Sequence, residues 1–222
     1  MTLIDGLGHD IDRVQKPKQL RAPNPALAFI LDIALIALFS ALVFVGVNFP
    51  SYYKIAMFRI NPEKFAKNVE TTVSFALPKD VSQLPDNSII ISKIGVAAPI
   101  VWDVKETEIM SALESGVAHL AGSGKPDAGK NIFLTGHSSN YWWSAGNYKT
   151  VFALLPELKE KDEILLTRDG AISRYEVEKI LEVKKSEVGD YLITDGERLT
   201  IMTCVPVGTN LRRLLVIAEL VL

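Results

Sequence analysis

Residues 199–216, LTIMTCVPVGTNLRRLLV, contain the only cysteine of the 222-residue chain, Cys204. The β-branched residues before Cys204 predict a strand, and the proline and glycine of PVG end it. Residues 212–222 predict a second strand, which returns beside the first and carries Arg212 or Arg213 back toward the sulfur. Because one thiol cannot form an intramolecular disulfide, Cys204 is either a small buried hydrophobe or a reactive group.

The segment TIMTC, followed by a short loop and RLLV, resembles the active-site signature of the sortases, which are cysteine transpeptidases of bacterial surfaces. The family's motif is TLxTC, and Ile201 here replaces the leucine with another apolar strand residue. Upstream, NIFLTGH resembles the family's strand that ends in a glycine and the catalytic histidine. The resemblance implies a triad of His137, Cys204 and Arg213. Arg213 is preferred because it immediately precedes the LLV run, and Arg212 is the alternative.

The resemblance also implies an enzyme that transfers an acyl group from an LPxTG-like sorting signal. Cys204 would attack the peptide bond after the threonine and form a thioester, and an amine of a cell-wall precursor or a pilin lysine would accept the acyl group. His137 would act as acid and then as base, and Arg213 would hold the developing negative charge. No cofactor or metal is expected, because the histidines, including His9 and His119, are dispersed along the chain.

Three further residues are candidates for substrate binding. Thr203, next to the cysteine, could position substrate through its hydroxyl. Trp142 and Trp143 lie in SSNYWWSAGNYKT, just after His137, and are placed at the rim of the substrate groove. Alternatively, the two tryptophans pack their own loop or touch lipid headgroups. His119 is interpreted as a loop or core residue.

The composition argues against a nucleic-acid partner, and two alternative functions stay open. The formal net charge is -2 and no basic stripe with interleaved aromatics occurs, so a nucleic-acid partner is not expected. A different exported cysteine acyltransferase is one alternative, although such enzymes usually carry a Ser-x-Gly-Cys type of motif. A catalytically silent, membrane-anchored barrel that binds partners is the other.

Residues 26–49, ALAFILDIALIALFSALVFVGVNF, form the one long apolar segment. As a helix the segment would extend about 36 Å, enough to cross a hydrocarbon core of about 30 Å. It therefore predicts a transmembrane signal anchor, with a buried core helix or a cleaved signal peptide as alternatives. Positive residues precede the span, so residues 1–25 are predicted to be a cytoplasmic tail and the residues after Pro50 to lie outside the plasma membrane. These positive residues are Arg13, Lys16, Lys18 and Arg21.

The remaining chain predicts a strand-rich domain. Residues 50–85 are expected to form a short membrane-proximal helix and a linker, and residues 86–222 the catalytic domain. Residues 168–170 contain Asp-Gly between two strand patterns, which predicts a hairpin. Residues 150–159 have apolar side chains at helical spacing. Many strands with a few short helices predict a closed antiparallel barrel of about eight strands, the architecture that the resemblance also implies.

Overall fold

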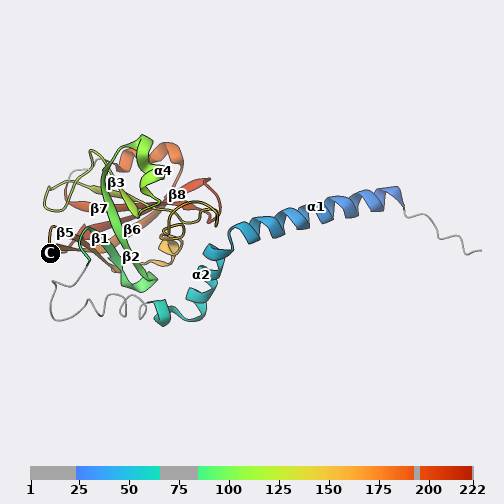
Figure 1. The fold of residues 1–222 in the computed structure, drawn as a ribbon, viewed down its shortest axis with the longest axis horizontal. Coiled ribbons are helices and arrows are strands. Elements are labelled where there is room, and N and C mark those ends of the chain that lie inside the picture. The colour runs from blue at the N-terminus through green and yellow to red at the C-terminus, as the bar shows by residue number, and fades with distance from the viewer. Residues whose placement is uncertain (1–23, 66–84, 193–195, 222) are drawn as a thin grey trace, which may run out of the picture. The chain divides into compact units, whose positions relative to one another are not determined.

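A computed structural model describes residues 24–65, 85–192 and 196–221. Two compact units divide the chain, one ending at Leu42 and the other beginning at Val43. Most of the predicted cytoplasmic tail and most of the predicted linker lie outside the described residues. Figure 1 draws the elements of both units.

Helix α1, Pro25–Val47, is 23 residues long, and none of its residues is buried. Asn24 caps its start, since the Asn24 side-chain oxygen accepts the backbone N–H of Ala26 at 3.1 Å. Pro25 is the first residue of the helix, where the missing backbone N–H of proline breaks no helical hydrogen bond. Asp32 is the one charged residue in the helix. By length and composition, α1 is able to cross a membrane.

Eight strands form a closed barrel in the order β1-β2-β3-β4-β7-β8-β6-β5, and β5 pairs back with β1 (Figure 1). This confirms the predicted barrel, in which closure removes the exposed sheet edge. The strands are β1 Ser88–Ile91, β2 Val96–Val104, β3 Val117–Leu120, β4 Ile132–Thr135, β5 Glu163–Arg168, β6 Ala171–Val183, β7 Arg198–Val205 and β8 Arg212–Leu220.

Two pairings differ from the antiparallel expectation. Strands β2 and β3 are parallel, and so are β4 and β7. A parallel pairing requires a crossover, and short helical turns, η3 Glu106–Glu108 and α4 Ile109–Ala112, supply it between β2 and β3. The chain between β4 and β7 includes the whole β5–β6 hairpin. The second parallel pairing therefore joins segments that are distant in the sequence.

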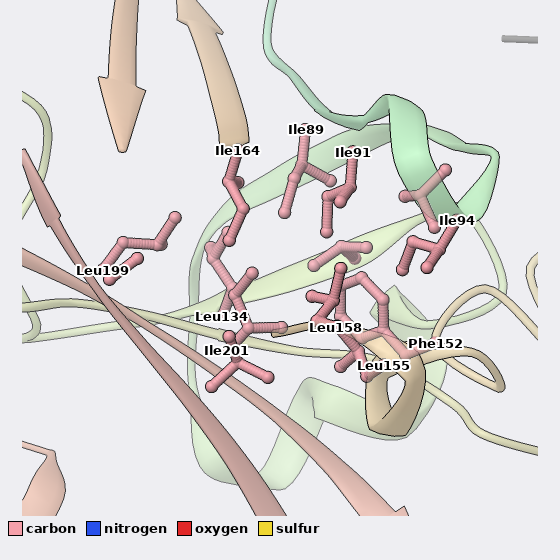
Figure 2. Close-up of a cluster of buried hydrophobic side chains, with 14 of the residues drawn as sticks. Ile89, Ile91, Ile94, Leu134, Phe152, Leu155, Leu158, Ile164, Leu199 and Ile201 are labelled. Atoms are coloured by element: carbon pink, nitrogen blue, oxygen red, sulfur yellow. The ribbon is translucent and has the colours of Figure 1, made fainter. Parts of the chain in front are cut away.

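The barrel interior is an apolar cluster to which several strands contribute alternate residues. Figure 2 shows Leu134 from β4 and Ile201 from β7 pointing into this cluster, where both are fully buried. Phe152 and Leu155, which follow the loop after β4, belong to the same apolar cluster. Truncating Leu134 or Ile201 to alanine is expected to cost about 2–5 kcal/mol, because the cavity cannot close fully.

The predicted hairpin is confirmed, and the predicted helix at residues 150–159 is only partly present. Strands β5 and β6 pair across Asp169 and Gly170, which both have positive φ angles, 52° and 77°.

The predicted helix at residues 150–159 is reduced to turns and one short 3₁₀ helix, η4 Leu155–Glu157. Pro156 lies inside it and has no N–H to continue a helical ladder.

Helix α2, Phe49–Ile60, packs one face on the barrel. Phe58 is buried in the barrel cluster, and Ile55 packs against the cluster. On its exposed side, Arg59 pairs with Glu157 at 2.9 Å. The helix lies in the region where a membrane-proximal helix is predicted, and its packing on the barrel goes beyond that prediction.

Candidate active site

Cys204 lies on the face of β7 that points away from the barrel interior. The strand alternates: Leu199, Ile201 and Val205 belong to the apolar cluster, and Cys204 lies on the opposite face. The thiol residue is half-exposed and not bonded to another cysteine. Cys204 is therefore not one of the buried residues of the core.

Arg213 is the arginine on the face of Cys204. In the antiparallel β7–β8 ladder Cys204 pairs with Arg213, and Val205 pairs with Arg212. The side chains of two directly opposite residues point from the same face of the sheet. Arg213 therefore shares the face of Cys204, and the neighbouring Arg212 points from the opposite face. Arg212 donates to the Glu182 carbonyl at 3.0 Å.

The Arg213 guanidinium is held over the β7–β8 loop by backbone carbonyls. Its Nη1 donates to the carbonyls of Asn210 at 3.0 Å and of Arg212 at 3.1 Å. Both bonds use the same nitrogen, so the Nε and Nη2 donors are not consumed by them. A guanidinium held in this way retains donors for an oxyanion.

His137 follows β4, and the parallel β4–β7 register brings it toward Cys204. Thr135 pairs with Met202, and the Gly136 N–H continues the ladder by donating to the Met202 carbonyl at 3.2 Å. The β4–β7 strand pairing ends at Thr135, and if its register continued for two more residues, His137 would lie opposite Cys204.

Gly136 allows this approach because no side chain fits there. A Cβ on Gly136 would lie 2.5 Å from Cδ2 of Phe152, a fully buried ring. The backbone N–H of Phe152 in turn donates to the His137 carbonyl at 2.9 Å. The histidine is thus fixed from the core side by one aromatic residue.

Burial shapes the electrostatics of the histidine. Desolvation lowers the pKa of His137 below its ordinary value, which favours the neutral imidazole at neutral pH. The Asn140 side-chain nitrogen lies 3.4 Å from Nε2 of His137. Asn140 is a neighbour that the sequence reasoning missed, and its position three residues after the histidine was the only available signal.

Thr203 is buried beside the site. Its hydroxyl donates to the Gly136 carbonyl at 2.9 Å, and its side chain is 1% exposed. This bond ties β7 to the residue that precedes His137. The predicted contact between Thr203 and substrate stays a prediction.

Trp142 and Trp143 lie in the loop after His137 and are exposed, at 67% and 58%. Their rings meet edge to face with centroids 5.4 Å apart, and Tyr141 stacks on Trp143 at 4.8 Å. An exposed aromatic cluster in the loop after His137 is free to contact a peptide. The assignment to the groove rim stays a prediction.

His119 is a core residue of another part of the barrel. It is fully buried on β3 opposite Leu134, and its Nε2 lies 2.7 Å from the Gly124 carbonyl oxygen. Its Nδ1 accepts the Asp103 backbone N–H at 3.1 Å. Both ring nitrogens therefore have partners. Within residues 24–65, 85–192 and 196–221, no group of three or more histidine, cysteine or acidic residues could hold a metal.

A family model described as Sortase domain matches residues 89–221. The chain belongs to the sortase family. That match includes Cys204, Arg213 and His137. Among curated proteins, none matches this sortase.

Solved structures of sortases share the fold. Sortase C-1 from Actinomyces oris is 27% identical to this sortase, with 76% of this chain and 98% of that chain covered and a TM-score of 0.52. Sortase A from Corynebacterium diphtheriae is 25% identical, with 83% and 95% covered and a TM-score of 0.51. Sortase C1 from Streptococcus suis, at 22% identity, 71% and 94% coverage and a TM-score of 0.52, shares the fold alone.

Proposed function

We propose that this sortase is a cysteine transpeptidase that cleaves an LPxTG-like sorting signal and transfers the protein to an amine. The observation that carries the proposal is the pairing of Cys204 with Arg213 on the face toward which the β4–β7 register directs His137. A thiol, an imidazole and a guanidinium on one face supply a nucleophile, a proton carrier and an oxyanion donor.

In the first half of the reaction, His137 takes the thiol proton as the sulfur of Cys204 attacks the carbonyl carbon of the threonine. The lowered pKa of His137 supports this role, because a neutral imidazole can accept a proton. Arg213 donates to the carbonyl oxygen as it becomes negative. The C–N bond then breaks, His137 protonates the leaving amine, and a thioester remains on Cys204.

In the second half, an acceptor amine attacks the thioester carbonyl. His137 takes a proton from that amine, and Arg213 again holds the oxyanion. The C–S bond breaks, the new amide is released, and the proton returns to the sulfur of Cys204. The acceptor is an amine of a cell-wall precursor or a pilin lysine.

Helix α1 is proposed to anchor the enzyme in the plasma membrane with its N-terminus in the cytoplasm. Its 23-residue apolar length and the positive residues that precede it support this topology. Tethering raises the effective concentration of substrates confined to the same surface. Protease digestion of sealed vesicles tests the topology: the proposal requires the catalytic domain to be digested from the outside only.

A direct test of catalysis uses the full chain in detergent micelles with a fluorogenic LPxTG peptide. We expect peptide cleavage and a thioester adduct on Cys204 that mass spectrometry detects. The variant Cys204→Ala should show neither. A folded wild-type chain that neither cleaves the peptide nor forms the adduct would refute the transpeptidase and support the silent barrel.

A further inference from the structure

Helix α2 contacts both ends of the loop that follows His137. The Ser51 hydroxyl donates to the carbonyl of Ser138, the residue directly after the histidine, at 3.0 Å. The Lys54 ammonium donates to the carbonyl of Thr150 at 3.1 Å. One helix therefore holds the start and the end of this loop.

The same helix contacts the loop that follows Cys204. The Tyr52 hydroxyl donates to the carbonyl of Val207 at 3.1 Å. Next to it, Gly208 packs so closely on Asn48 that an added Cβ would lie 2.8 Å from the Asn48 side chain. Gly208 also has a φ of 87°, which favours glycine.

The two loops are bonded to each other as well. The backbone N–H of Gly208 donates to the Ser139 hydroxyl at 3.0 Å. The residue after His137 is thus connected with the loop after Cys204 in two ways, through the Ser51 and Tyr52 contacts of α2 and through this bond between the loops. A shift of α2 would move the two loops together.

The Ser51 contact is buried, and the contacts of Tyr52 and Gly208 are part-buried, so water has limited access to replace them. Ser51 is 1% exposed and Asn48 is 8% exposed. The face of α2 that carries Ser51 and Lys54 continues in Ile55 and Phe58, which pack on the barrel core at helical spacing. The apolar contacts fix the helix on the barrel, and the polar contacts transmit that position to the loops.

We propose that Ser51 and Tyr52 are positioning residues that align His137 with Cys204 through the two loops. This inference rests on the proposed transpeptidase function. Only Asn48 separates α1 from α2 in the chain. The segment that leaves the membrane-anchor helix is therefore the one that holds the catalytic loops.

The test uses the full chain in micelles with Ser51→Ala, Tyr52→Phe and the double variant. Each substitution removes one hydroxyl and no other group, so the packing volume is nearly kept. We expect the double variant to lose roughly 10- to 100-fold in kcat with little change in KM, since small misplacement of reacting groups lowers the rate steeply. We also expect a changed pH profile for alkylation of Cys204 by iodoacetamide. Because Cys204 is the only cysteine, the alkylation signal comes from one site.

The matched control is Arg59→Gln, which breaks another contact between α2 and the barrel, the ion pair with Glu157. This control should keep the wild-type kcat and alkylation profile. A double variant with wild-type kcat and a wild-type alkylation profile would overturn the proposal, even with a lower melting temperature. If the double variant does not fold, the kcat and the alkylation profile of the single variant Tyr52→Phe decide whether the proposal holds. A wild type that cleaves no peptide refutes the transpeptidase, and the alkylation profile still decides the positioning role.

Discussion

Cys204 and Arg213 are direct cross-strand partners in the β7–β8 ladder, and Arg212 is the partner of Val205. The alternation of side chains along β8 thus separates two adjacent arginines onto opposite faces. Only Arg213 shares the face of the thiol, which agrees with the choice made from the LLV run. The difference between the two arginines leads directly to a test.

Arg213→Lys is expected to lower kcat by about 100-fold or more, because a lysine cannot reproduce the fixed fork of donors at the oxyanion. Arg212→Lys should change kcat by less than about threefold, since an exposed pair such as that with Glu182 contributes little. Steady-state kinetics with the LPxTG peptide measure both. The opposite order of effects would contradict the assignment of Arg213.

Gly136→Ala is expected to reduce activity strongly and to destabilise the protein by about 1–3 kcal/mol, because the new methyl group meets the Phe152 ring. The comparison is Gly189→Ala, where an added Cβ has no atom within 4 Å. Thermal unfolding and peptide cleavage measure the two effects. Equal activity of the two variants would show that the close packing at Gly136 does not position His137.

The pH dependence of kcat/KM should reflect the buried histidine. Desolvation lowers the pKa of His137, so the acid limb should lie below the ordinary histidine pKa of about 6.5. Asn140→Asp places a carboxylate where the amide nitrogen lies 3.4 Å from Nε2, and it should move the acid limb to higher pH. Asn147→Asp adds the same charge elsewhere in the loop and serves as control. An acid limb unaffected by Asn140→Asp would argue against His137 as the titrating group.

Lys54 should make the free energy of unfolding rise with pH. Burial lowers the pKa of Lys54 from 10.5 to about 8, so between these values the unfolded chain binds more protons than the folded one. The stabilisation is absent below about pH 8 and grows as pH rises toward the unfolded pKa, by about 2 kcal/mol from pH 8 to 9.5. Urea unfolding of wild type and Lys54→Met over this range measures the difference. Parallel curves for the two proteins would contradict a buried, titrating Lys54.

Trp142 and Trp143 are predicted to contact substrate at the groove rim. Replacing both by alanine should raise KM by roughly tenfold with kcat nearly unchanged, because exposed rings near His137 would add binding energy without entering the chemistry. The control is Trp102→Phe, a half-buried tryptophan that packs on His119. An unchanged KM in the double variant would favour loop packing or contact with lipid headgroups instead.

Local sequence patterns were sufficient for the elements whose partners lie nearby. The Asp169-Gly170 dipeptide specifies a turn by its own backbone preference, so the β5–β6 hairpin followed from a few residues. The length of the apolar run was sufficient to predict α1. The segment around Pro156 shows the limit of such patterns, since helical spacing was present but the proline restricted the helix to a short 3₁₀ turn.

By itself, the sequence determined which residue types are available for chemistry: one cysteine, a histidine after a strand, and two arginines at the start of another strand. Tertiary structure alone decided the parallel pairing of β4 with β7 and the contacts of Ser51 and Tyr52 with loops 87 and 155 residues away. The physical reason is that periodicity and turn preference act over a few residues. Pairing between distant segments depends instead on which buried faces and backbone groups satisfy one another once the barrel has closed.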